Sequence, residues 1–590
     1  MMDERLKKTA VLQPFHYDSV TLLEGRFQTQ FHEMLEYFLA LPDDDILYGF
    51  RRRAGKETSG SELGGWYSND SSEYSYIGFD EIFNTFGQWL SFLGRAYRAT
   101  GNQKVREKAV NLLKGWGETI DEDGYFFYTN DCNAHHYSYE KIMSGLVDLY
   151  VYAEIEEAAD YLARITRWAE KHLLRTRKPA SSERSIFCGQ DDAVKGIDTE
   201  WYTLSEGLYR AYLATGDVRY KEFARVWHYD HYWDSMREKR PEVMTGVHGY
   251  SHVNNLGGAA MAYQVTGEQK YLDTITNGYE MLKTYQLMAS GGYAFNEHMD
   301  SPDEGNYETV THMGRSFEVP CGTWAIFKLV RHLISLTGEA KYGAWAETAL
   351  YNAIGAALPM KDDDQRRGKT FYYADYRYGG GRKVYYENSF PCCSGTYPQA
   401  VTEFHNLIYY RNEEGIYITQ YLPSRLQTEI GGMKAALSIM GAYPETDEVT
   451  VTVESQGDFC ISLRIPGWLM AGDGRVYINE ERQDCELLAD TWLKLNRSWK
   501  AGDKIRMILP MHLRTSGITR GHGERAALMY GPVMLAAEGR HTEINEDCND
   551  LKDMEATKSG LTFRSGDLIF RPYWTFGERE WYSLYLDYRK

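Results

Sequence analysis

The phrase RAYRATGNQKV, residues 95–105, indicates how most of this chain folds. It returns with variations as RAYLATGDVRY (210–220), MAYQVTGEQKY (261–271) and LISLTGEAKY (333–342), each time with Thr-Gly between two amphipathic segments. A glycine just beyond a helix takes the left-handed conformation that closes the last turn. Acidic residues then lie where the next helix begins and suit its dipole: Asp217, Glu268 and Glu339. Each phrase predicts a helix, a tight turn and a second helix.

Repeated helical hairpins build either an open solenoid or a closed toroid. The spacing here is irregular, and long loops rich in glycine and aromatic residues separate the hairpins. An open solenoid would keep a short, fixed period. The pattern therefore favours an (α/α)6 helical toroid over residues 20–411.

The periodicity changes after about residue 412. Short β-type runs such as GIYITQYLPSRLQ, EVTVTVE and DKIRMILPM alternate with Gly, Asp, Asn and Pro, which is typical of β-sandwich domains. A helical front and a β-rich back without βαβ alternation predict a multidomain α + β protein, with the β-sandwich region at 412–590. Residues 1–19 form a separate amino-terminal segment, and the sequence leaves open whether it packs on the toroid or on the β region.

Length and charge narrow the class of protein. The chain has 590 residues, which suggests two or more domains, and a formal net charge of -19, which disfavours nucleic acid and anionic membranes as partners. No apolar run approaches the ~18 residues of a membrane span. The start, MMDERLKKTAVLQPF, lacks the apolar core of a signal peptide, so we expect a cytoplasmic protein. The 47 Tyr and 14 Trp suit stacking on sugar rings, and suit helix packing equally well.

Two cysteine-containing segments suggest a metal site. FPCCSGTYPQ carries the adjacent Cys392 and Cys393, and RSFEVPCGTW carries Glu318 and Cys321 just before an expected helix. Zinc takes four ligands, mostly thiolate, imidazole or carboxylate, and these residues supply such a set without the usual Cys-x-x-Cys pairs. Buried apolar packing is the alternative. We expect packing roles for the scattered cysteines: Cys132, Cys188, Cys460, Cys485 and Cys548.

The loop-like stretch GGYAFNEHMDSPDEGNYE, residues 291–308, holds a candidate general acid. Carboxylates in such a loop are usually solvated. Glu297 follows a turn rich in glycine and aromatic residues, which can place it beside a ligand. A general acid needs a partly desolvated position to hold its proton near neutral pH. Glu297 is therefore a candidate acid, with a solvated surface position as the alternative.

At these residues the sequence resembles the zinc- and cysteine-dependent β-L-arabinofuranosidases of glycoside hydrolase family 127 and their relatives. CCSGTYPQ is similar to the family's Cys-Cys motif, and RSFEVPCGTW to its Glu-and-Cys motif. YSYEKIMSGLVDLY resembles the early sugar-site helix, and VHGYSHVNNLGGAAMAYQVTG holds a histidine where the family contacts substrate. LRIPGWLMAGDGRVYINEE and ERAALMYGPVMLAAEG in the β region are also similar, so the resemblance covers most of the chain.

The resemblance implies a retaining exo-glycoside hydrolase that acts on a non-reducing terminal sugar, a β-L-arabinofuranoside or a related glycoside. Its nucleophile would be a Zn2+-bound thiolate, and a glutamate would serve as acid/base while a glycosyl-thioether forms and is hydrolysed. The implied catalytic residues are Cys392 and Glu297. The implied zinc ligands are Glu318, Cys321, Cys392 and Cys393, and the implied substrate-binding residues are Tyr139, Glu140, Lys141 and His248.

Three features depart from the family pattern. Better-known members have Glu-x-Cys, whereas two residues separate Glu318 from Cys321 here, which leaves the fourth zinc ligand open. The loop from Glu297 to Cys321 is longer than expected, so Glu304 competes for the acid/base role. A family histidine is replaced near Trp201, which affects the sugar accepted more than the reaction class.

Two other functions stay open at this point. A toroid-fold polysaccharide lyase or sugar epimerase would abstract a proton with Tyr, His or Arg and would not need Cys392. A non-catalytic carbohydrate-binding protein would use zinc only structurally. Without a signal peptide, the expected partner is an oligosaccharide or small glycoside rather than intact polymer, and a homodimer is possible.

Overall fold

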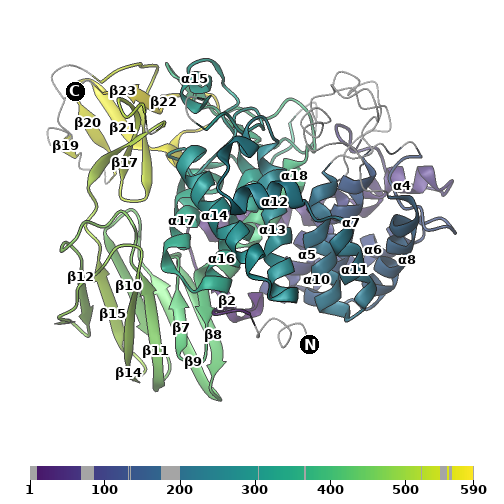
Figure 1. Cartoon of the computed structure of the whole chain (residues 1–590), viewed down its shortest axis with the longest axis horizontal. Coiled ribbons are helices and arrows are strands. Elements are labelled where there is room, and N and C mark those ends of the chain that lie inside the picture. Colours follow the sequence, from purple (N-terminus) through teal and green to yellow (C-terminus); the bar gives the residue numbers. More distant parts are fainter. Residues whose placement is uncertain are drawn as a thin grey trace.

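The computed structural model describes residues 9–67, 85–130, 132, 134–173, 200–302, 305–363, 367–519, 521–544, 555–556 and 561–588. Helices predominate up to α19 (Phe404–Ile408), and strands follow from β6 (Tyr409–Arg411) onward, as Figure 1 shows. None of the helices in these described ranges has the length and apolar character needed to cross a bilayer. The predicted α + β architecture is confirmed.

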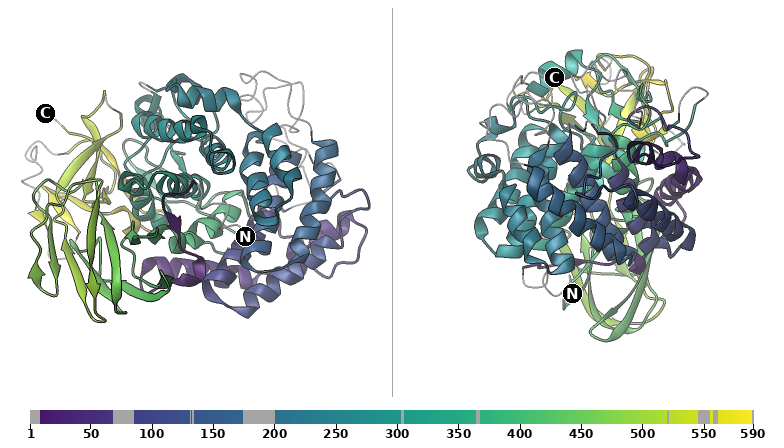
Figure 2. Two further views of the ribbon diagram at one scale, coloured as in Figure 1. Left: turned by 60° about the horizontal axis from the view of Figure 1, so that its bottom comes forward. Right: turned by 90° about the vertical axis from the view of Figure 1, so that its right-hand side faces the viewer.

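Within the described residues, six helices close into an inner ring, seen in the left view of Figure 2. Each packs against the next and the last packs against the first, in the order α5 (Phe86–Thr100), α7 (His135–Tyr152), α10 (Leu204–Thr215), α13 (Gly249–Thr266), α16 (Val319–Thr337) and α18 (Cys393–Thr402). The helices that cover this ring are α6 (Gln103–Gly117), α8 (Glu157–His172), α11 (Val218–Val226), α14 (Gln269–Tyr285), α17 (Gly343–Asn352) and α2 (Arg26–Ala40). This arrangement is the predicted (α/α)6 toroid. Shorter helices lie between these pairs: α3 (Asp43–Ile46), α4 (Tyr48–Arg53), α12 (Asp230–Arg237) and α15 (Gly305–His312).

The Thr-Gly turns have the predicted geometry. The four glycines have φ of 65°, 83°, 72° and 73° and cap α5, α10, α13 and α16: Gly101, Gly216, Gly267 and Gly338. Each threonine hydroxyl donates to the carbonyl four residues earlier, at 2.7 or 2.8 Å, and accepts the N–H two residues later. Asp217 then caps α11 by accepting the N–H of Arg219 at 2.9 Å. The repeated phrase is therefore a complete helix stop and helix start.

Two sheets form a β-sandwich after the toroid. The five-stranded sheet has the order β1-β6-β7-β11-β14 and the seven-stranded sheet β13-β12-β15-β10-β9-β8-β2. Apolar side chains of both sheets, such as Val451 and Ile461, share one buried core. The strands are β7 (Gly415–Ile418), β8 (Ser424–Ile430), β9 (Met433–Met440), β10 (Glu448–Val453), β11 (Gly457–Arg464), β12 (Arg475–Ile478), β13 (Glu481–Arg482), β14 (Trp492–Trp499) and β15 (Lys504–Ile508).

A third, nine-stranded sheet has an apolar core of its own. One of its strands, β5 (Gly381–Arg382), comes from a loop of the helical region and pairs with β22. Its other strands are β16 (Leu513–Gly517), β17 (Arg525–Tyr530), β18 (Val533–Glu538), β19 (Glu555–Ala556), β20 (Phe563–Ser565), β21 (Leu568–Pro572), β22 (Trp581–Ser583) and β23 (Tyr585–Asp587).

The amino-terminal segment contacts both parts of the molecule. Its strand β1 (Gln13–Pro14) pairs with β6, and β2 (Val20–Leu22), just beyond it, pairs with β8. The N–H groups of Val11 and Leu12 donate to the carbonyl of Ser335 near the end of α16, at 2.8 and 3.0 Å. The segment thus lies across the junction between toroid and sandwich.

The scattered cysteines only partly fit the expected packing role. Cys132 and Cys460 are buried, as expected. Cys485 is exposed, so the expectation is wrong for that residue, which lies in a polar loop between strands. Cys188 and Cys548 lie outside the described residues.

Candidate active site

A cluster of three thiols and one carboxylate lies where two neighbouring inner helices begin. Glu318 immediately precedes α16 and Cys321 is in its first turn, whereas Cys392 and Cys393 begin α18. The Cys321 sulfur is 3.7 Å from that of Cys392 and 3.4 Å from that of Cys393. Glu318 Oε1 is 3.3 and 3.7 Å from the sulfurs of Cys392 and Cys393. The four sequence-predicted ligands therefore come together.

The Glu-x-x-Cys spacing fits this cluster because α16 begins directly after Glu318. Residues three positions apart on a helix lie on the same face, so Glu318 and Cys321 point to the same side. Pro320 occupies the second helical position, where the missing N–H leaves no helical hydrogen bond unmade. The longer spacing is thus compatible with a carboxylate ligand.

The donor set matches what zinc requires. Tetrahedral zinc with Zn–S bonds of ~2.3 Å places two sulfurs roughly 3.8 Å apart, close to the 3.4 and 3.7 Å found here. Glu318 Oε2 is buried and has no hydrogen-bond partner among the described residues, which fits a carboxylate positioned to bind a cation. Cys392 is the half-buried member, whereas the other two thiols are buried. A substrate therefore has its best access to the sulfur of Cys392.

Negative charge concentrates on Cys392 within the cluster. Burial would raise the pKa of this thiol, but hydrogen bonds from Cys321, Cys393 and Tyr372 hold it well below its usual range. Burial raises the pKa of the Cys321 and Cys393 thiols. Burial and the charge on Cys392 also raise the pKa of the Glu318 carboxyl. Since the thiolate is the attacking form of cysteine, this arrangement favours Cys392 as the reactive sulfur.

The loop that carries Glu297 is held in an uncommon conformation. Ala294, Asn296 and Glu297 have φ of 65°, 46° and 70°, in the left-handed region that few non-glycine residues adopt. Each such residue costs ~1–3 kcal/mol, which the surroundings must offset. The N–H of Gly249, the first residue of α13, donates to the carbonyl of Glu297 at 2.6 Å. The loop is thereby anchored to the inner ring at the end where the cysteines lie.

Two tyrosines and a histidine surround the Glu297 carboxylate. Tyr372 donates its hydroxyl to Oε1 at 2.8 Å and lies 3.1 Å from the Cys392 sulfur. Tyr373 also donates to Oε1, and His248 Nε2 is 3.5 Å from Oε2. Burial would raise the pKa of Glu297, but the hydrogen bonds from His248, Tyr373 and Tyr372 lower it to about 2. Glu297 is therefore ionised in the resting site.

His248 lies between carboxylates. It directly precedes α13, and its Nδ1 is 2.8 Å from Ser251 Oγ and 3.3 Å from Glu200 Oε1. Its Nε2 faces Glu297 and is 3.9 Å from Glu318 Oε2. Burial would lower the pKa of His248, but these carboxylates raise it well above its usual range. His248 thus holds the proton that Glu297 lacks.

Two of the three sequence-predicted residues on α7 face this site. Lys141 Nζ is 2.6 Å from Glu140 Oε2, donates to the Tyr250 hydroxyl at 3.1 Å and lies 4.6 Å from the centre of the Tyr137 ring. Burial would lower the pKa of Lys141, but the neighbouring Glu140 and Glu200 carboxylates raise it above its usual value. Tyr139 points the other way, because its hydroxyl pairs with a threonine hydroxyl of α8 at 2.9 Å. The structure does not bring Tyr139 to the other site residues.

Sequence reasoning missed Glu200, Tyr372 and Tyr373. Glu200 directly precedes Trp201, in the stretch where the family histidine is replaced. It is buried, has φ of 56°, and lies beside His248. The tyrosines come from the segment FYYADYRY, whose density of aromatic residues is the one signal that could have identified them. Strand β4 (Tyr373–Ala374) pairs with β3 (Phe317–Glu318), and this pairing sets Tyr373 opposite Glu318. Glu304, the competing acid, lies outside the described residues.

Known proteins share this fold over their whole length. A GH127 β-arabinofuranosidase structure is 16% identical, with a TM-score of 0.71, and the match covers 98% of each chain. A GH127 β-L-arabinofuranosidase from Geobacillus stearothermophilus T6 is 17% identical, with a TM-score of 0.71, over 96% of this chain and 99% of that one. A structure described as a glycoside hydrolase is 14% identical, with a TM-score of 0.66, over 99% and 98%. No curated protein matches the sequence.

Two family models match the sequence itself. Residues 19–406 match the β-L-arabinofuranosidase GH127 catalytic domain, and residues 415–511 match the GH127 middle domain. The first match contains every residue of the site described above, and it covers more than half of the chain. The chain belongs to the GH127 β-L-arabinofuranosidase family and is a glycoside hydrolase.

Proposed function

We propose that this hydrolase is a retaining exo-enzyme that removes a terminal β-L-arabinofuranoside, or a closely related sugar, with Cys392 as nucleophile and Glu297 as acid/base. The observation that carries this proposal is the hydroxyl of Tyr372, which contacts both groups at 2.8 and 3.1 Å. These two distances limit the separation of carboxylate oxygen and sulfur to about 6 Å, and retaining glycosidases hold their two catalytic groups about 5–5.5 Å apart.

We further propose that Glu318, Cys321, Cys392 and Cys393 hold Zn2+. When bound, zinc would supply positive charge that keeps the thiol of Cys392 deprotonated at neutral pH. The support is the mutual approach of the four ligand atoms to within 4.8 Å. The carboxylate and the three thiols are the ligand types that zinc prefers.

The proposed first step is attack by the Cys392 sulfur on the anomeric carbon. A C–S bond forms, the glycosidic C–O bond breaks, and the leaving oxygen takes a proton from Glu297. Because Glu297 is ionised at rest, it receives that proton from His248 Nε2, 3.5 Å away. Glu297 then deprotonates a water molecule, whose oxygen displaces the sulfur and restores the thiolate. The proton taken up by Glu297 returns to His248, which restores the resting site. Two displacements at one carbon retain its configuration.

Sugar recognition is assigned to the polar groups around this centre. Lys141 and Glu140 form a buried ion pair at 2.6 Å beside the Tyr137 ring, and His248 presents Nε2 toward the acid/base. Such a combination of charged donors, charged acceptors and an aromatic ring suits the hydroxyl groups and faces of a small sugar. We propose Glu140, Lys141 and His248 as substrate-binding residues, and an oligosaccharide or small glycoside as the substrate.

The test compares wild type with Cys392→Ser. Wild type should contain about one zinc per chain and turn over one member of a panel of aryl pentosides and hexosides. Cys392→Ser should lose turnover, and Cys485→Ser, an exposed cysteine in the β region, should behave as wild type. Proton NMR of the first-formed product should show retention. A metal-free active wild type, or an active Cys392→Ser enzyme, would overturn the thiolate mechanism.

A further inference from the structure

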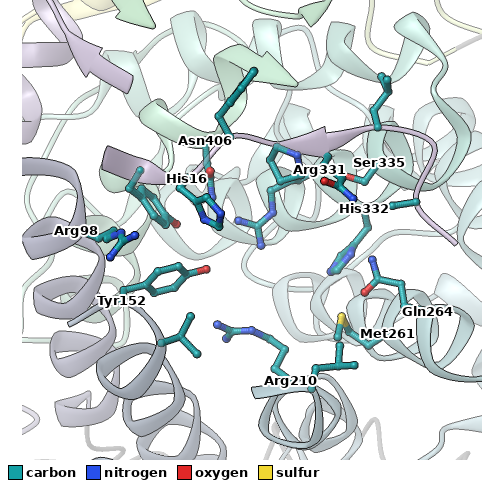
Figure 3. Close-up of a pocket in the computed structure, with 18 of the residues that line it drawn as sticks. His16, Arg98, Tyr152, Arg210, Met261, Gln264, Arg331, His332, Ser335 and Asn406 are labelled. Atoms are coloured by element: carbon teal, nitrogen blue, oxygen red, sulfur yellow. The ribbon is translucent and has the colours of Figure 1, made fainter. Parts of the chain in front are cut away.

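A cavity lies toward the opposite end of the toroid from the cysteine cluster. It has a volume of about 300 Å³ and is shown in Figure 3. Its walls are residues of α5, α7, α10, α13 and α16, most of them in the carboxyl-terminal halves of these helices, together with the amino-terminal segment. Gln264 lies about 16 residues beyond His248 along α13, which corresponds to roughly 24 Å at the helical rise. The Gln264 side of the cavity is therefore remote from the cysteine cluster, and a smaller pocket lined by Glu140, Lys141, Glu206 and Arg210 lies between the two.

Guanidinium groups dominate the polar part of this cavity. Arg210 and Arg331 extend into it from α10 and α16 (Figure 3). Behind them, Asp148 pairs with Arg210 and with Arg95 at 2.9 Å, and Glu403 pairs with Arg95 at 2.5 Å and with Arg331 at 2.6 Å. Three guanidinium groups thus share two buried carboxylates. This network keeps a positive charge although the chain as a whole has a net charge of -19.

The other acidic groups at the cavity wall also lie beside cations. Glu206 lies 2.6 Å from Lys328, and Glu154 lies 2.9 Å from Arg98, which is also 2.8 Å from Asp18. Asp18 and Glu154 thus share one cation, and this extra carboxylate offsets the single positive charge of the arginine network. Arg411, a further lining residue, adds another cation near the amino-terminal segment. The charges that face the cavity therefore favour an anion.

One explanation without a ligand is that the arginines only balance the buried acids and the negative ends of the helices. The hydrogen bonds argue for more than this. Within the described part of the chain, Arg210 donates through Nη2 to Asp148, and Arg331 donates through Nη1 to Glu403. Each guanidinium has five N–H donors, so both arginines keep further donors for a ligand. Both side chains are only 14–15% exposed, so water competes weakly for their remaining donors. A cavity, rather than packed side chains, faces these donors.

Neutral groups complete the wall. The Tyr152 hydroxyl and the Gln264 amide point into the cavity in Figure 3, and Gln264 Oε1 has no hydrogen-bond partner among the described residues. Val151, Leu213 and Met261 supply an apolar side. The volume is at the lower end of the range for small-molecule sites, about 300–1,000 Å³, and so suits a ligand no larger than a monosaccharide derivative.

We propose that this cavity is a second ligand site, which binds a small oxyanion that also carries hydroxyl groups. Arg210 and Arg331 would bind the anionic oxygens, and Tyr152 and Gln264 would bind the hydroxyl groups. Phosphate esters and sugar acids share this chemistry. The proposal does not depend on the catalytic mechanism, because none of these residues belongs to the cysteine cluster.

Isothermal titration calorimetry on the full-length protein tests the proposal with glycerol phosphate, glucuronate and inorganic phosphate as probes. We expect saturable binding of glycerol phosphate or glucuronate, tighter than that of inorganic phosphate, and the tighter of the two identifies the anionic group. Arg331→Gln should weaken binding about 10- to 100-fold, since it removes charge-assisted hydrogen bonds. Arg225→Gln, an exposed residue on the outer helix α11, is the matched control and should bind as wild type.

A second variant guards against misfolding of Arg331→Gln. Gln264→Trp keeps every charge, fills part of the cavity from a half-buried position, and should abolish binding. Cys392→Ser should bind the probes as wild type does. The proposal is overturned if wild type binds none of the probes up to ~10 mM, or if Gln264→Trp binds as tightly as wild type. Loss of binding in Cys392→Ser would also overturn it, because the anion would then lie at the catalytic site.

Discussion

Replacing Tyr372 by phenylalanine tests whether a single hydroxyl couples the acid/base to the nucleophile. The hydroxyl has one proton and lies 2.8 Å from Glu297 Oε1 and 3.1 Å from the Cys392 sulfur, so it donates to one of them at a time. Losing one hydrogen bond to a charged acceptor costs ~1.5–3 kcal/mol, and ~1.4 kcal/mol is a factor of ten in rate. We expect kcat/KM for an aryl β-L-arabinofuranoside to fall about 10- to 100-fold.

Tyr385→Phe is the matched control, because Tyr385 lies in the same connection between α17 and α18. Its hydroxyl donates to the Pro359 carbonyl at 2.7 Å in an exposed position, so its kcat/KM should stay within about twofold of wild type. Circular dichroism would establish that both variants fold. A Tyr372→Phe enzyme with wild-type kcat/KM would refute the coupling. A change in KM alone would refute it too, because that pattern indicates lost ground-state binding.

Two further predictions concern stability. Burial, assisted by nearby Arg571, lowers the pKa of Lys383 to about 7, whereas lysine in an unfolded chain has a pKa of ~10.4. Between these two pH values the unfolded chain binds more protons than the folded one. The free energy of unfolding of wild type therefore rises with pH in this range. Lys383→Met removes this dependence. In urea unfolding, the free energy of unfolding of Lys383→Met minus that of wild type should therefore fall by about 2 kcal/mol from about pH 7 to about pH 9. An equal difference at the two pH values would contradict the pKa shift. The second prediction concerns the contact between α5 and α7, where a Cβ at Gly145 would lie 2.2 Å from the Gly87 carbonyl oxygen. Gly145→Ala should therefore cost ~1–3 kcal/mol of folding free energy and lower the melting temperature. Gly523→Ala is the control and should leave the melting temperature unchanged, because nothing lies within 4 Å of its added Cβ. An unchanged melting temperature in Gly145→Ala would show that this helix contact tolerates a methyl group.

The helical hairpins and the β runs could be predicted because nearby residues create them. In the first Thr-Gly turn the Thr100 hydroxyl bonds one turn back at 2.7 Å, and Gly101 takes the left-handed conformation that ends α5. In β10, buried and half-buried side chains alternate with a period of two. These patterns depend on hydrogen bonds and pleating within a few residues, so they are visible in any sequence that contains them.

The cysteine cluster is an intermediate case. Cys321 and Cys392 are 71 residues apart in the chain, and the motifs alone suggested ligands without showing that they meet. The resemblance implied that they do. The physical reason is in the ring: α16 and α18 are neighbours, and both helices begin at the same end.

Only the tertiary structure decided which side chains face the centre. The sequence pointed to Tyr139, yet the rotation of α7 turns Tyr137 toward Lys141 and Tyr139 toward α8. That rotation follows from packing, since the close approach of α5 and α7 at Gly87 and Gly145 leaves no room for another orientation.

Glu200 and Tyr372 illustrate the same limit. Glu200 reaches His248 across the gap between α10 and α13, and Tyr372 reaches Glu297 and Cys392 from a loop that no motif marked. Local sequence sets where helices and strands begin and end, because the stabilising bonds are short in sequence. The site is composed of contacts between distant segments, and those arise only when the ring closes through α18 against α5 and buries its apolar faces.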